Sequence, residues 1–177
     1  LFTSILGISH PRASSVIDDS AEVVSSADRA AFMARLGYLP QDVPAPWTMR
    51  LHEFVAYAAW LKGLDQKAAG VRATQALERV NLSDEARKRM TALSGGMRRR
   101  AGIAAALVHD PAVLVLDEPT AGLDPVERRR LHELVRELAT QCIVVVSTHL
   151  LEDVRSVGGQ VNVLADGLLV AVGLVTD

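Results

Sequence analysis

Two short runs of uninterrupted apolar residues constrain the fold of this chain more than any other feature. They are AVLVLD, which ends at Asp117, and IVVVS, which ends at Ser147. Apolar residues that do not alternate with polar ones are typical of parallel strands buried on both faces. The two runs therefore predict an α/β fold with a largely parallel sheet.

The segment between the two runs carries the signals of a connecting helix. Asp124 is placed to cap it, Pro125 falls in its first turn, and Glu127 would complete a capping box. Four apolar residues at helical spacing predict its buried stripe: Leu131, Leu134, Val135 and Leu138. Strand, helix and strand thus form a βαβ unit.

The flanking segments add a strand and a hairpin. LGYLP predicts an earlier strand closed by Pro40, preceded by polar turns. Asp166-Gly167 lies between two apolar runs, a pattern that predicts a C-terminal antiparallel hairpin.

A helical segment interrupts this pattern. Between Asp42 and Met90 the apolar residues recur at helical spacing, which predicts two helices and a short third one after Ser83. The length of 177 residues fits one domain with a small subdomain. We expect residues 1–41 and 98–177 to form a partial α/β core and residues 42–97 to form the helical subdomain.

Composition excludes several classes of protein. With 19 basic and 21 acidic residues and a net charge of −2, the chain has no overall field that favours nucleic acid. Cys142 is the single cysteine, so it predicts neither a disulfide nor a zinc site, and we interpret it as a small core residue. No apolar run reaches the roughly 18 residues of a membrane span, so a membrane link requires a partner.

Polar residues follow each predicted parallel strand. These are Gln41, the pair Asp117 and Glu118, and His149. Ligands of open α/β sheets bind beyond the carboxyl ends of the strands, so these residues are expected at one edge. One acid suits Mg²⁺ and the other can accept a proton, although adjacent acids also cap helices. A histidine here suits a phosphate or its attacking water, although a lone histidine is usually structural.

The stretch LSGG predicts a second polar site. Ser94 can cap a helix, and Gly95 and Gly96 would let backbone N–H groups approach an anion, although Ser-Gly-Gly is also a common plain turn. Basic residues cluster at 98–100 and 87–89. Because no aromatic residues are interleaved with them, a solvated basic face is favoured over a nucleic-acid contact.

Taken in order, these residues resemble the ATP-binding subunit or domain of ABC transporters. Gln41 in GYLPQD looks like the Q-loop, LSGGM like the signature motif and VLVLDEP like the Walker B strand. AGLDP looks like the D-loop, and STH looks like the switch histidine. The five motifs cover most of the chain between Gly37 and His149, in the order of the family.

The resemblance implies a P-loop NTPase-like (RecA-like) fold that uses ATP and Mg²⁺. Asp117 would hold Mg²⁺ through its water shell, and Gln41 would link the metal and the attacking water to a membrane partner. Glu118 would be the general base, and His149 would contact the γ-phosphate.

The resemblance also implies two partners. Ser94, Gly95, Gly96 and Asp124 would act across a head-to-tail dimer, on nucleotide bound by a second nucleotide-binding domain. A transmembrane permease would hold the ATPase at the cytoplasmic side of the membrane. Candidates for that contact are Trp47, Met49 and Phe54, which could equally fill the core of the helical subdomain.

One motif of the family is missing. The Walker A loop, G-x-x-x-x-G-K-[ST], has no match, because none of the lysines Lys62, Lys67 and Lys88 follows that glycine spacing. LFTSILGI resembles the helix that leaves this loop, so we interpret the sequence as truncated at its start. The Walker A loop supplies most of the phosphate contacts, so this chain is expected to bind Mg-ATP weakly or not at all.

The function predicted from the sequence is ATP binding and hydrolysis that drives transmembrane transport, most similar to bacterial ABC-2-type exporters. One alternative is an ABC ATPase of nucleic-acid repair or translation, which would usually add arms or zinc modules. The other is a degenerate, non-hydrolysing regulatory subunit, against which Asp117, Glu118 and His149 argue.

Overall fold

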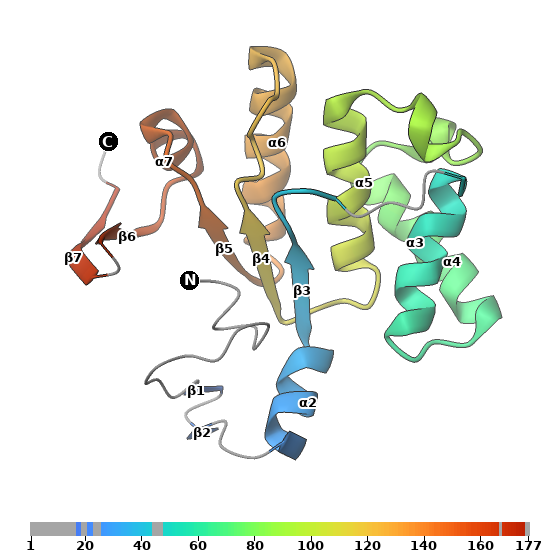
Figure 1. Cartoon of the computed structure of the whole chain (residues 1–177), viewed down its shortest axis with the longest axis horizontal. Coiled ribbons are helices and arrows are strands. Elements are labelled where there is room, and N and C mark those ends of the chain that lie inside the picture. Colours follow the sequence, from blue (N-terminus) through green and yellow to red (C-terminus); the bar gives the residue numbers. More distant parts are fainter. Residues whose placement is uncertain (1–16, 19–20, 23–25, 44–47, 167, 176–177) are drawn as a thin grey trace. The chain divides into compact units, whose positions relative to one another are not determined.

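A computed structural model describes residues 17–18, 21–22, 26–43, 48–166 and 168–175 (Figure 1). The helix expected at LFTSILGI, and Trp47, lie outside these residues. The chain divides into two units, one of Arg35–Thr148 and one of Leu1–Ala34 with His149–Asp177.

The first unit is built on a parallel sheet of three strands. They are β3 (Leu36–Leu39), β4 (Val113–Asp117) and β5 (Ile143–Ser147), in the order β3-β4-β5. The register pairs Asp117 with Ser147 at the carboxyl ends of β4 and β5. The predicted α/β class and the parallel pairing of the two apolar runs are confirmed.

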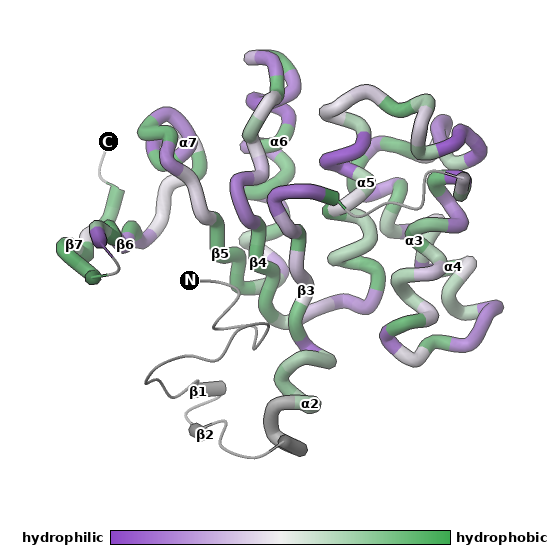
Figure 2. Tube along the Cα trace, viewed as in Figure 1, coloured by the Kyte–Doolittle hydropathy of each residue, from purple (hydrophilic) through white to green (hydrophobic). Residues whose placement is uncertain are grey.

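Only one of the two apolar runs is buried as expected. In β4, Leu114, Val115 and Leu116 are buried, whereas in β5 the side chains of Ile143 and Val145 are 65% and 38% exposed. Figure 2 shows both strands as apolar segments, so hydropathy alone does not separate them. The expectation for β5 was wrong because one face of this strand is uncovered: Ile143 and Val145 point to the same face and are exposed, whereas Val144 and Val146 are half-buried.

The connecting helix α6 (Pro125–Leu138) begins and packs as its sequence predicts. Asp124 Oδ1 accepts hydrogen bonds from the backbone N–H of Val126 and of Glu127, both at 2.9 Å. The predicted stripe is buried: Leu131, Leu134, Val135 and Leu138. The Glu127 carboxylate, expected in a capping box, instead contacts Arg100 and Arg130.

The predicted helical segment contains α3 (Leu51–Leu61) and α4 (Gln66–Arg79). The short third element is a 3-10 helix, η1 (Ser83–Glu85), followed by a second one, η2 (Met90–Ala92). Their apolar faces meet in a common core: Leu51, Phe54, Val55, Ala69, Ala73, Leu77 and Met90. Across the ranges that the structure describes, no helix is both long and apolar enough to cross a membrane.

Helix α5 (Gly95–Leu107) joins the helical segment to the sheet. Glycines allow its close approach to β3. A Cβ built on Gly37 would press against the backbone oxygen of Ala106, and one built on Gly102 would lie 2.5 Å from Leu39 Cδ1. The end of β3 is therefore held directly against α5.

The second unit contains short elements and a hairpin. Strands β1 (Ile17–Asp18) and β2 (Ala21–Glu22) pair antiparallel, and so do β6 (Gln160–Ala165) and β7 (Leu168–Leu174). The pairing of Ala165 with Leu168 confirms the predicted C-terminal hairpin.

Two helices of this unit were not predicted. Helix α2 (Ser26–Ala34) occupies a segment interpreted as polar turns, and α7 (Leu151–Val157) follows His149. The sequence of α2, SADRAAFMA, is rich in alanine, the best helix former, and its apolar residues are segregated to one side as clearly as those of α4. Both its alanine content and its periodicity are signals from which this helix could have been predicted.

Candidate functional site

Asp117 ends β4 and is fixed by two hydroxyl groups. Ser147 Oγ donates to Asp117 Oδ1 at 2.5 Å, and the Tyr38 hydroxyl lies 3.4 Å from Asp117 Oδ2. Burial raises the pKa of Tyr38, and the negative charge of Asp117 raises that pKa further. Tyr38 therefore stays a hydrogen-bond donor, and the half-buried carboxylate is held in one orientation.

Glu118 has an unusual backbone conformation. Its φ is +46°, in the left-handed region that residues with a Cβ rarely adopt. Its N–H donates to Ser147 Oγ at 2.9 Å, and its carbonyl accepts from an Arg99 guanidinium nitrogen at 3.0 Å. Hydrogen bonds on both sides thus hold the strained turn that carries the candidate base.

Arg99 was wrongly predicted to belong to a solvated basic face. It is only 8% exposed, and its second guanidinium nitrogen donates to the carbonyls of Pro40 at 3.2 Å and Gln41 at 2.5 Å. Burial lowers the pKa of this arginine. The carboxylates of Asp42, Asp117 and Glu118 oppose that lowering of the pKa. The buried side chain therefore connects the loop after β3 to the turn after β4 by hydrogen bonds.

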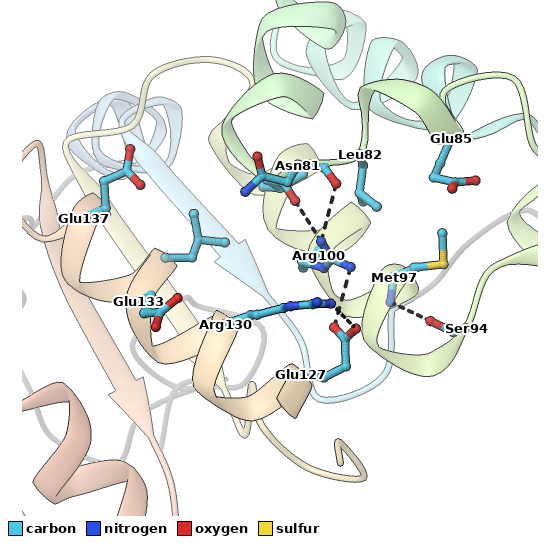
Figure 3. A pocket seen from close by; sticks show the side chains of 12 residues that line it. Asn81, Leu82, Glu85, Ser94, Met97, Arg100, Glu127, Arg130, Glu133 and Glu137 are labelled. Atoms are coloured by element: carbon cyan, nitrogen blue, oxygen red, sulfur yellow. Dashed lines mark hydrogen bonds and ion pairs between the residues drawn. The ribbon is translucent and has the colours of Figure 1, made fainter. Parts of the chain in front are cut away.

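Arg100 also points inward. Its guanidinium donates to the carbonyls of Val80 and Asn81 at 3.3 and 3.4 Å, and it lies 3.5 Å from Glu127 (Figure 3). Figure 3 shows Arg130 reaching the same carboxylate. The exposed part of the predicted basic face is therefore residues 87–89.

The signature segment begins α5 as expected. Ser94 Oγ accepts the N–H of Met97 at 3.2 Å, and a Cβ on Gly95 would meet open space. Gly96 is buried, and a Cβ there would lie 2.6 Å from Glu127 Oε2. The first turn of α5 therefore packs against the first turn of α6, which Asp124 caps.

A cavity of about 700 Å³ lies beside this contact (Figure 3). Its lining comes from α5, α6 and the segment after α4. Its charged residues are Glu85, Arg100, Glu127, Arg130, Glu133 and Glu137. Asp117 and Glu118 are not among its lining residues, so the cavity is separate from the candidate catalytic carboxylates.

The structure brings some predicted site residues together. The Arg99 guanidinium donates hydrogen bonds to the backbone carbonyls of both Gln41 and Glu118. The Ser147 hydroxyl donates to the Asp117 carboxylate and accepts the Glu118 N–H. His149 is exposed and belongs to the second unit.

Sequence reasoning missed Tyr38, Ser147 and Arg99. The two hydroxyl residues could have been found, because each lies on a strand next to β4, near the strand's end. Arg99 could not, because nothing in RRR distinguishes its middle member.

Few acidic side chains of the described structure lie where they could bind Mg²⁺. Within the described ranges, no group of three or more His, Cys, Asp or Glu side chains gathers to hold a metal ion. Mg²⁺ bound to a nucleotide needs fewer protein ligands, because it keeps several waters and takes one or two carboxylates with the phosphates. A single oriented carboxylate at a strand end, such as Asp117, fits that use.

Comparison with known proteins identifies relatives along most of the chain. The family described as ABC transporter matches residues 1–121. The linearmycin resistance ATP-binding protein LnrL of Bacillus subtilis is 34% identical over 155 residues, which is 87% of this chain and 50% of that protein. The Nod factor export ATP-binding protein I of Burkholderia pseudomallei is 37% identical over 172 residues, 96% of this chain and 55% of that protein.

Solved structures match at the level of the fold. CbiO1 of Clostridium perfringens, part of the transporter complex cbiONQ, superposes with a TM-score of 0.86 at 27% identity, covering 97% of this chain and 70% of that one. An ATP-binding cassette bound to ADP and Pi gives 0.83 at 22% identity, covering 99% and 79%. This chain spans about half the length of the curated relatives described above. With the strand, turn and helix arrangement around Asp117, these matches show that the chain belongs to the ABC transporter family and has the fold of its ATP-binding component.

Proposed function

We propose that this chain provides the catalytic carboxylates of an ATPase that drives transmembrane export. The observation that carries the proposal is the pair Asp117 and Glu118 at the end of a central strand, with Ser147 bonded to both residues. Asp117 would hold the water shell of Mg²⁺, which supplies neutralisation of the phosphate charge. Glu118 would accept the proton of the attacking water at its carboxylate.

The remaining site residues would act around this pair. Gln41 would face the metal and the water from the loop after β3, and His149 would donate to the γ-phosphate. Ser94, Gly95 and Gly96 would present the N-terminus of α5 to nucleotide on a second subunit, with Asp124 at the same interface. This arrangement requires a head-to-tail dimer.

Phosphate binding of this kind would also need a Walker A loop, which has no match among the 177 residues. Two of the three lysines already have other roles: Lys62 Nζ donates to the Leu36 carbonyl at 2.9 Å, and Lys88 pairs with Glu85 at 2.5 Å. The pKa of Lys62 is lowered by burial. The chain as given should therefore bind Mg-ATP poorly, which a calorimetric titration would test; micromolar affinity would refute this expectation.

The proposal of export is supported by the name of one relative, the Nod factor export ATP-binding protein I, and is compatible with that of the other, a linearmycin resistance protein. A permease would then hold the ATPase at the cytoplasmic face of the membrane. Of the residues considered for that contact, Phe54 is 8% exposed and fills the core, which favours the alternative of a packing role. Met49 is half-buried.

The structure weakens both alternative functions. A nucleic-acid ATPase needs basic surface, yet Arg99 and Arg100 are turned to internal carbonyls. A non-hydrolysing subunit would not need the oriented Asp117 carboxylate or the strained Glu118 backbone, which persists only where the surroundings impose it.

The test is Glu118→Gln in a chain that carries a Walker A loop. The amide keeps the size of the side chain but cannot accept the proton, so turnover should fall while ATP binding and an ATP-bound dimer persist. Glu53→Gln, an exposed glutamate on α3, is the matched control. Unchanged turnover in Glu118→Gln would overturn the base assignment.

A further inference from the structure

We propose that Arg99 is a positioning residue that joins the loop carrying Gln41 to the backbone of Glu118, so that the orientation of the base depends on that loop. This inference rests on the proposed role of Glu118 in ATP hydrolysis. It concerns the first unit alone, where the side chain of Arg99 and its three backbone partners lie.

The two terminal nitrogens of the Arg99 guanidinium bond two different backbone segments. One guanidinium nitrogen of Arg99 donates to the carbonyls of Pro40 and Gln41, and the other donates to the carbonyl of Glu118 at 3.0 Å. The group is rigid and planar, so a displacement of one carbonyl is transmitted to the other. The residue is 92% buried, as its 8% exposure shows, and water does not compete readily for these bonds.

The backbone of Glu118 makes it sensitive to this connection. At a φ of +46° the residue is strained, and relaxation toward the common regions would swing its side chain away. Ser147 Oγ restrains the N–H side and Arg99 restrains the carbonyl side. The same carbonyl also accepts the Ala121 N–H of the turn at 3.2 Å, so removing Arg99 leaves the carbonyl held locally but no longer joined to the loop that carries Gln41.

The loop after β3 is well placed to be the moving part. Gln41 and Asp42 are exposed, while Leu39, just before them, is fully buried. Gln41 is also the residue expected to face the metal, the water and the permease. A displacement of this loop would reach Glu118 through the guanidinium, without any contact between the two side chains.

The first test compares Arg99→Lys and Arg99→Gln in a chain that includes a Walker A loop. Lysine keeps the charge, but a single ammonium cannot bond both backbone segments in the same geometry. Both variants should therefore lose kcat on the order of 100-fold, the loss typical of a misplaced group, with KM for ATP unchanged. Arg87→Gln, an exposed arginine, should leave both constants unchanged.

A second variant moves the loop without touching Arg99. A Cβ at Gly102 would lie 2.5 Å from Leu39 and 2.9 Å from Val43, which flank the loop. Gly102→Ala should therefore lower kcat at constant KM. In the double variant with Arg99→Gln it should add no further loss, because the connection is already broken.

The outcomes separate the two proposals. If Glu118→Gln leaves turnover intact, the proposed function fails. If Glu118→Gln abolishes turnover but Arg99→Lys retains full activity, charge alone suffices and the positioning role is overturned. If both Arg99 variants fail to fold, as monitored by thermal unfolding, Gly102→Ala decides, and unchanged kcat in that variant would overturn the inference.

Discussion

Replacing Gly37 by alanine should destabilise the protein, because β3 lies too close to α5 for a side chain. Gly37 pairs with Leu114 in the sheet, and a Cβ there would press on the backbone oxygen of Ala106. It would also lie 3.0 Å from Leu114 Cδ1 and from Pro111 Cγ. A backbone oxygen cannot rotate away, so the strand or the helix must move.

The magnitude follows from two opposing effects. Overpacking of a filled site costs about 1–3 kcal/mol, and alanine recovers about 0.4–1 kcal/mol by restricting the unfolded chain. The net loss is about 1–2 kcal/mol, which in a protein of this size lowers Tm by roughly 2–8 °C.

The assay is thermal and urea unfolding followed by circular dichroism, with the urea m-value expected to stay constant. Gly70→Ala, on α4, is the matched control, because a Cβ at Gly70 would meet only Cε1 of His52, at 4.0 Å. That variant should gain about 0.5–1 kcal/mol from helix propensity. If Gly37→Ala were as stable as Gly70→Ala, the close approach of β3 to α5 would be refuted.

Two further predictions concern a helix cap and acid stability. Asp124→Ala removes the acceptor of two N–H groups and should lower the free energy of unfolding in urea by about 1 kcal/mol. Asp124→Asn should keep most of the stability of the original protein, because an asparagine side chain also caps helices; an equal loss in both variants would contradict the capping role. Burial lowers the pKa of His109, whose Nε2 contacts the Leu36 carbonyl while its buried Nδ1 has no hydrogen-bond partner in the described structure. Protonation is thus disfavoured in the folded state, so this contribution to stability is present above the ordinary pKa of histidine, about 6.5, and is lost as the pH falls below it. His109→Gln should reduce the fall in Tm between about pH 7 and pH 5, and an unchanged pH profile would argue against this assignment.

Local signals explain what the sequence could predict. The caps at Asp124 and Ser94 each depend on a side chain and an N–H two or three residues away, so the pattern of neighbours suffices. The polar ends of β3 and β4 follow in the same way from where each apolar run stops.

Contacts between distant segments explain what it could not. Arg99 bonds residues 58 and 19 positions away, and nothing in its own neighbourhood separates it from Arg98. The exposure of β5 depends on whether other elements cover its two faces, although its composition is that of a buried strand. Burial at these positions is set by tertiary packing, which periodicity does not encode.

The contact between Gly96 and Glu127 bears on how relatives of this chain are interpreted. A side chain at Gly96 would have to displace the Glu127 carboxylate of the same subunit from its contacts with Arg100 and Arg130, whether or not nucleotide ever approaches it. A relative that has lost ATP hydrolysis would still be under selection to keep this glycine for folding. Its retention is therefore poor evidence of activity by itself.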